Sequence, residues 1–254
     1  MSAAEPSTRI EFAGLPGSGK TTMAHAVVAR LAASGLTVVE VGGLRPAPTD
    51  ESRLERARFL WALVAADPRS ALRVLNSCRP DRGGLSAARA YLARQSGLAD
   101  FHRSPLATAQ GAVLLVDEGE VQGVLTLLQG EPPSKRRLRA AVDLLERGPS
   151  LKNTTVVCLG IRPALAASRI AARGASHGRL DHGDERARLL ALEAAVKPLD
   201  ALLLAAERAG ARVLRIDSDG GADDALDLVV SAVVDRMTRS QSVLAVSIQS
   251  LPRG

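Results

Sequence analysis

The sequence predicts an α/β fold in which five parallel strands form a sheet covered by helices on both faces. Short runs rich in Val, Ile and Leu alternate with longer segments of helical periodicity, which is typical of a parallel sheet with crossover helices. The run at 111–116 is apolar throughout and predicts a strand buried on both faces, as does the run at 154–161. The chain of 254 residues contains no convincing linker, so we expect a single domain, 1–254.

The predicted elements follow one another along the chain. Strands are expected at 9–15, 37–41, 111–116, 154–161 and 212–216. Helices are expected at 21–33, 121–128, 134–147, 164–173, 184–209 and 222–238, with Pro198 as the point where the longest can bend. The segment 51–103 has a helical pattern with several breaks. Residues 239–254 are predicted as a C-terminal tail, in which 243–248 is either an edge strand or irregular.

The composition favours a small phosphorylated ligand over a membrane or a nucleic acid. The net charge is +6, and eleven Arg against six acidic residues in 45–103 account for most of it. No long Lys/Arg run of the kind found in nucleic-acid-binding tails occurs. No uncharged apolar run approaches the roughly 18 residues of a membrane helix, and the start does not resemble a signal peptide. Cys78 and Cys158 show no pairing pattern, which predicts a reducing, cytoplasmic setting.

The segment 14–21 carries the most specific motif of the chain. Its letters GLPGSGKT fit G-x-x-x-x-G-K-[ST], and it lies between a predicted strand and a predicted helix. Glycines let backbone N–H groups surround phosphate oxygens, and the helix that follows adds the positive end of its dipole. We therefore predict a phosphate loop for Mg-ATP, in which Lys20 reaches the β- and γ-phosphates and the Thr21 hydroxyl binds Mg²⁺. Its binding residues are Gly14, Gly17, Ser18, Gly19, Lys20, Thr21 and Thr22.

Two acidic residues, Asp117 and Glu118, directly follow the apolar run 111–116. Ligands of parallel α/β sheets bind at the carboxyl ends of the strands, so Asp117 is expected to face the phosphate loop. We predict that Asp117 holds Mg²⁺, directly or through water, and that Glu118 is a base or orients a nucleophile. Gly119 would allow a close approach of the backbone to a ligand.

Three arginines mark a segment expected to cover the nucleotide. Arg169, Arg173 and Arg179 flank a Gly-rich stretch, and 169–183 is predicted as a mobile lid. Arg stays charged and binds phosphate through two nitrogens, so these side chains can neutralise the transferred phosphoryl group. Arg173 is the predicted catalytic member.

The segment 44–110 is too long for a simple crossover and is predicted as a helical insert that binds a phosphoryl acceptor. It holds Phe59, Trp61, Tyr91 and Phe101, four of the five aromatic residues of the chain. Aromatic rings can stack on a base, or they can fill the core of the insert. The predicted acceptor-binding residues are Glu40, Arg45, Phe59 and Tyr91, although Glu40 can equally be a strand residue that points outward.

The order of these motifs resembles nucleoside-monophosphate-kinase-like P-loop proteins, and is most similar to thymidylate kinase. The phosphate loop, the long acceptor segment, Asp117, the start of a lid at 169–174 and the last strand at 211–217 appear in the family's order, over about 8–238. The resemblance implies a three-layer α/β/α P-loop fold with strand order 2-3-1-4-5, a helical acceptor-binding insert and an Arg-bearing lid.

These residues predict an ATP-dependent kinase that transfers the γ-phosphoryl group of Mg-ATP to a nucleoside, a nucleotide, or a related metabolite or antibiotic. The alternative is a P-loop ATPase that acts as a switch or motor subunit, in which Glu118 of the Asp117–Glu118 pair polarises water. A GTPase ranks last because the sequence has no Asn-Lys-x-Asp motif. The expected partner is a small-molecule acceptor, without nucleic acid or membrane, and a homodimer is left open.

Overall fold

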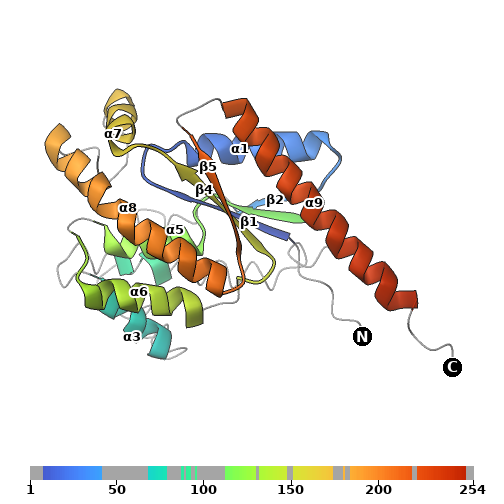
Figure 1. The fold of residues 1–254 in the computed structure, drawn as a ribbon, viewed down its shortest axis with the longest axis horizontal. Coiled ribbons are helices and arrows are strands. Elements are labelled where there is room, and N and C mark those ends of the chain that lie inside the picture. The colour runs from blue at the N-terminus through green and yellow to red at the C-terminus, as the bar shows by residue number, and fades with distance from the viewer. Residues whose placement is uncertain are drawn as a thin grey trace, which may run out of the picture.

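The computed structural model describes residues 8–41, 68–78, 87, 88, 90–92, 95, 112–129, 132–147, 151–173, 180, 184–218 and 222–249. Within these residues the chain forms a sheet between two layers of helices (Figure 1). The predicted α/β class is confirmed.

Five strands form one parallel sheet in the order β2-β3-β1-β4-β5. Their bounds are β1 Thr8–Gly14, β2 Val38–Val41, β3 Val113–Val116, β4 Thr154–Gly160 and β5 Arg212–Asp217. The central strand β1 is buried along its length, and Glu11 pairs with Val116 of β3 on one side and Val156 of β4 on the other. Because all pairs are parallel, the carboxyl ends of the five strands share one edge of the sheet.

One face of the sheet is covered by α1, Lys20–Ala33, and α9, Ala222–Gln249. Alternate residues of a strand point to opposite faces, and Ile10 and Phe12 of β1 point to this one. They pack against apolar residues of the two helices, among them Val27 and Val229.

The other face is covered by a larger group of helices, which Figure 1 shows to the left of the sheet and below it. They are α3 Pro68–Ser77, α5 Glu120–Leu128, α6 Lys135–Arg147, α7 Pro163–Ala172 and α8 Glu185–Arg208. Ala13 and Cys158 point from the strands into the core that these helices enclose. The described part of the predicted insert belongs to this layer, because the guanidinium Nε of Arg137 in α6 donates to the Ser77 carbonyl of α3 at 3.1 Å.

Two helix ends show how local sequence sets the bounds. Asp184 caps α8 by accepting a hydrogen bond of 2.6 Å from the Ala187 N–H, and Pro198 is accommodated inside that helix. The last helix extends beyond its predicted end at residue 238. Helix α9 continues to Gln249, so 243–248 is neither an edge strand nor irregular. The β-branched residues there favour a strand only weakly, and a helix that is already formed extends easily.

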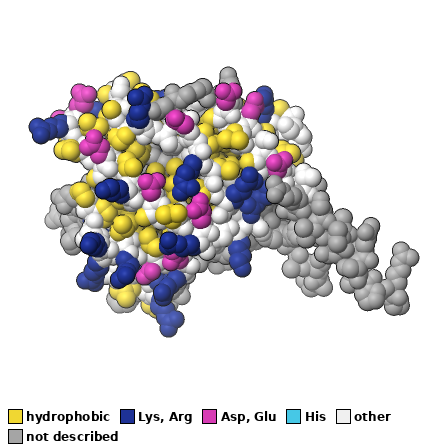
Figure 2. Space-filling view, in the orientation of Figure 1, with side chains coloured by type: hydrophobic (Ala, Val, Ile, Leu, Met, Phe, Trp, Pro, Cys, Tyr) yellow, Lys and Arg dark blue, Asp and Glu magenta, His cyan; other side chains and the backbone are white. Residues whose placement is uncertain are grey.

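The surface mixes charges of both signs. Figure 2 shows basic and acidic side chains across the viewed face, with hydrophobic side chains between them. Among the described residues, no helix has the length and apolar character that would let it cross a membrane.

Candidate functional site

The loop 14–21 runs from the end of β1 to the start of α1. Gly17 has a φ of 84°, and a Cβ at this position would lie 2.7 Å from the Ala166 carbonyl oxygen of α7. A Cβ at Gly14, whose φ is 150°, would lie 2.7 Å from the Leu159 carbonyl oxygen of β4. Side chains are thus excluded at both positions, and the loop lies tightly against β4 and α7 with a left-handed Gly19 at the start of α1.

Lys20 folds back onto this loop. Its Nζ donates to the Gly14 carbonyl at 3.1 Å and to the Leu15 carbonyl at 3.0 Å. Burial lowers the pKa of Lys20 to about 8, an effect opposed by the negative charges of Glu118 and Asp117. The ammonium group therefore lies inside the loop and within electrostatic reach of Asp117 and Glu118, the two acidic residues that follow β3.

Thr21 and Asp117 meet across the sheet edge, as the sequence predicts. The Thr21 hydroxyl donates to Asp117 Oδ2 at 3.1 Å, and β1 and β3 are neighbours in the sheet. A hydroxyl and one carboxylate are oxygen donors of the kind that bind Mg²⁺, which usually takes few protein ligands and completes its shell with phosphate oxygens and water. No group of three or more His, Cys, Asp or Glu side chains that could hold a metal lies within the described ranges.

The loop also contains a polar atom without a partner. Ser18 is 2 % exposed, and its Oγ has no hydrogen-bond partner among the described residues. A buried hydroxyl without a partner costs free energy that a bound oxygen-rich ligand can recover. Together with the glycine backbone, Lys20 and the Thr21–Asp117 pair, this atom fits a bound phosphate chain and its metal.

The predicted lid residues are described only in part. Arg169 of α7 donates through Nη2 to the Ser218 carbonyl after β5 at 3.2 Å, which joins α7 to the end of β5. Arg173 is exposed at the end of α7, and its positive charge lowers the pKa of Lys20. The structure therefore brings Arg173 within electrostatic reach of the loop, whereas Arg179 lies outside the described residues.

The start of α5 is tied to β1 by two buried contacts that the sequence did not predict. The Gly14 N–H donates to Gln122 Oε1 at 3.1 Å. The Glu120 N–H donates to Glu11 Oε2 at 2.8 Å, and a Cβ at the preceding Gly119 would collide with the Glu11 side chain. The turn that carries Asp117 and Glu118 leads into α5, and these hydrogen bonds hold the start of α5 against β1, the strand that precedes loop 14–21.

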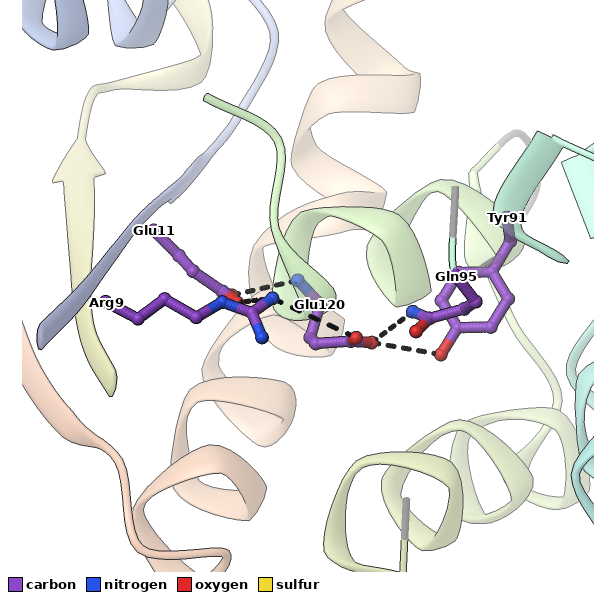
Figure 3. A network of polar contacts seen from close by, with 5 residues as sticks. All are labelled: Arg9, Glu11, Tyr91, Gln95 and Glu120. Atoms are coloured by element: carbon purple, nitrogen blue, oxygen red, sulfur yellow. Dashed lines mark hydrogen bonds and ion pairs between the residues drawn. The ribbon is translucent and has the colours of Figure 1, made fainter. Parts of the chain in front are cut away.

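Glu120 connects this arrangement to the insert, as Figure 3 shows. Its carboxylate accepts hydrogen bonds from the Tyr91 hydroxyl, at 3.2 Å, and from the Gln95 amide, and it lies 4.0 Å from Arg9. Arg9 also forms an ion pair with Glu11. Burial and the nearby Glu11 charge raise the pKa of Glu120 to about 7, although Arg9 opposes the shift. We name Arg9, Glu11, Tyr91, Gln95 and Glu120 the Glu120 network.

The predicted acceptor residues divide into three groups. Tyr91 is buried in the core, where its hydroxyl donates to Glu120 in the Glu120 network. Glu40 is exposed on β2 and lies 3.6 Å from His25 Nε2 of α1, so it points outward on the α1 side. Arg45 and Phe59 lie outside the described residues.

A scan of protein-family models and a search of curated proteins each found no match to this chain. The resemblance to thymidylate kinase thus remains an expectation from the motifs.

Proposed function

We propose that this chain is an ATP-dependent small-molecule kinase that transfers the γ-phosphoryl group of Mg-ATP to a nucleoside, nucleotide, or related metabolite or antibiotic. The observation that carries the proposal is the meeting of Thr21 with Asp117, at 3.1 Å, beside the half-buried Lys20. A phosphate loop needs a metal-binding pair and a cation at one place. The Thr21–Asp117 pair and the Lys20 ammonium group lie together where β1 and β3 end, which supports this assignment.

Each residue has a defined part in this reaction. The backbone of loop 14–21 and Ser18 Oγ would bind phosphate oxygens, and Thr21 and Asp117 would hold Mg²⁺. When bound, Mg-ATP supplies the phosphoryl group and a divalent charge at the phosphates. Lys20 would leave the carbonyls of Gly14 and Leu15 for the phosphates, and Arg173 would add positive charge from the end of α7. Catalysis would consist of positioning and charge stabilisation.

Two features favour a kinase over an ATPase. The insert contacts the core at the Glu120 network, next to the turn that carries Asp117 and Glu118, which is where an acceptor-binding segment would act. Arg173 belongs to this same chain, so the site needs no neighbouring subunit to supply a cation. Glu118 exerts the largest charge effect on Lys20 and could instead polarise water, which supports the ATPase as the second candidate.

The test is ADP release with and without acceptors. We would measure it for the wild type, for Lys20→Ala and for Lys197→Ala, a matched change of an exposed lysine on α8. The panel of acceptors comprises nucleosides, nucleotides and aminosugar-like compounds. We expect acceptor-dependent ADP release that Lys20→Ala abolishes and Lys197→Ala preserves, with unchanged circular dichroism in both.

Two results would contradict the proposal. Near-wild-type activity of Lys20→Ala would remove the phosphate-binding role of loop 14–21. ADP release that no acceptor stimulates would favour the ATPase.

A further inference from the structure

The side chains of the Glu120 network take no direct part in the proposed reaction, although they are buried and charged. Glu11 is 0 % exposed and Glu120 is 2 % exposed, and Arg9 is also buried. Well-packed apolar side chains in place of buried charges often leave a fold equally stable or more stable. Stability alone therefore does not explain these charges, whereas a role in positioning the surrounding backbone does.

The network holds the far end of the turn that carries Asp117. The Glu120 N–H donates to Glu11 Oε2 at 2.8 Å, and the backbone at Gly119 lies directly on the Glu11 side chain, where a Cβ would collide. At its near end the turn follows Val116, the last residue of β3, which pairs with Glu11 in the sheet. Asp117 therefore lies on a short turn that is held to β1 at both ends.

The carboxylate of Glu120 bridges the insert and the central strand. Its Oε2 accepts from the Tyr91 hydroxyl, at 3.2 Å, and from the Gln95 amide, while its Oε1 lies 4.0 Å from Arg9 Nη2. Tyr91 and Gln95 are both helical and four residues apart, the spacing that places side chains on one face of a helix. Figure 3 shows them reaching the carboxylate from the side opposite Arg9. A shift of this part of the insert would therefore act on Glu120 and on the backbone next to it.

We propose that Glu120 is a positioning residue: held by Tyr91 and Gln95 of the insert, it fixes the turn that precedes it, so that Asp117 and Thr21 bind Mg²⁺ together. This proposal rests on the proposed function, because it concerns the same metal site. Metal affinity depends on the contacts that orient the ligands, and from Asp117 these contacts lead along the turn to Glu120. A ligand that moves the insert would then also change the affinity for Mg-nucleotide.

The test measures how much Mg²⁺ improves nucleotide binding. N-Methylanthraniloyl-ATP would be titrated into the full chain in excess Mg²⁺ and in EDTA, and the ratio of the two Kd values is the Mg²⁺ gain. Outer contacts of metal ligands typically change metal affinity by roughly 10–100-fold, and Tyr91 acts one contact further out. We therefore expect Tyr91→Phe to lower the Mg²⁺ gain about three- to tenfold, with a Kd in EDTA within about twofold of wild type.

Two further variants complete the comparison. Gln95→Leu removes the other donor to Glu120 and should lower the Mg²⁺ gain in the same way. Ser77→Ala is the matched control, because it removes a buried hydroxyl from the same layer of helices, where that hydroxyl donates to the Arg73 carbonyl of α3 at 2.8 Å. Ser77→Ala should keep the wild-type Mg²⁺ gain, even where it lowers the free energy of unfolding.

A wild-type Mg²⁺ gain in folded Tyr91→Phe and Gln95→Leu would overturn the proposal and leave the network a role in stability alone. An equal loss in Ser77→Ala would overturn it as well, because any loosening of the helical layer would then suffice. Wild-type protein that binds the nucleotide without a Mg²⁺ gain, or does not bind it, would contradict the proposed function and this proposal with it. A wild-type gain that both variants retain separates the two failures, since the metal site then stands and only the role of Glu120 falls.

Discussion

The Gly14 N–H and the Gln122 side chain form a buried hydrogen bond of 3.1 Å between the start of loop 14–21 and α5. This bond crosses 108 residues of sequence. It holds the loop against the helix that follows Asp117 and Glu118, so the two halves of the proposed site are joined directly as well as through the sheet.

We predict that Gln122→Leu weakens both the fold and nucleotide binding. The Gly14 N–H would be left buried without an acceptor, which costs about 1–3 kcal/mol. Chemical denaturation and titration with a fluorescent ATP analogue measure the two effects. Gln129→Leu makes the same change at the other end of α5 and should have little effect. Equal losses in the two variants would show that the Gly14 bond has no special role.

Much of the fold was predictable from the sequence because it depends on local patterns. The runs that form β3 and β4 are mostly apolar. The motif of loop 14–21 predicts a strand directly before the loop and a helix directly after it. Asp117 was predictable for a geometric reason, since a residue after β3 must lie at the same sheet edge as the end of β1.

The Glu120 network was not predictable in the same way. Glu120 contacts Glu11 across 109 residues, and no local pattern encodes such a pairing. The sole signal was two charged residues, Arg9 and Glu11, at alternate positions of a strand whose residues 10, 12 and 13 are apolar. Charges that point into the core require partners. That requirement says only that partners exist, not which residues they are.

We predict that Thr21→Val weakens Mg²⁺ binding and lowers activity. Valine has nearly the same shape as threonine but cannot bind a metal or donate to Asp117. Loss of one metal ligand should lower activity by roughly 10–100-fold and shift the Mg²⁺ titration to higher concentration. Thr21→Ser keeps the hydroxyl and should stay close to wild type. A Mg²⁺ titration curve for Thr21→Val that overlays the wild-type curve would exclude Thr21 as a ligand.

Arg173→Ala should lower turnover more than ATP affinity. Arg173 is exposed at the end of α7, yet its charge reaches Lys20, so we expect it to act mainly when the transferring group develops charge. A fall in kcat of roughly 10–100-fold with an ATP Kd within about twofold of wild type is expected.

The matched control for Arg173 is Arg186→Ala, which removes an exposed arginine from the first turn of α8. Arg186→Ala should change neither kcat nor the Kd for ATP. An Arg173→Ala variant that loses ATP affinity and keeps its kcat would indicate a binding role in place of a catalytic one.

Glu120 should make stability depend on pH near neutrality. Its pKa is raised from 4.5 to about 7 on folding, so the folded state holds this proton more tightly than the unfolded state does. The resulting stability is fully present below pH 4.5 and is lost as the pH rises through 7.

Glu120→Gln cannot ionise and should not show this loss. Relative to wild type, its free energy of unfolding should therefore improve between pH 5 and pH 8, by roughly 1–3 kcal/mol. Urea denaturation at several pH values in this window measures the change. Glu193→Gln, an exposed change on α8, should keep a constant difference from wild type. If the difference for Glu120→Gln is equally constant, the buried carboxyl does not titrate in this range, and the contacts of Arg9, Tyr91 and Gln95 must keep it ionised throughout.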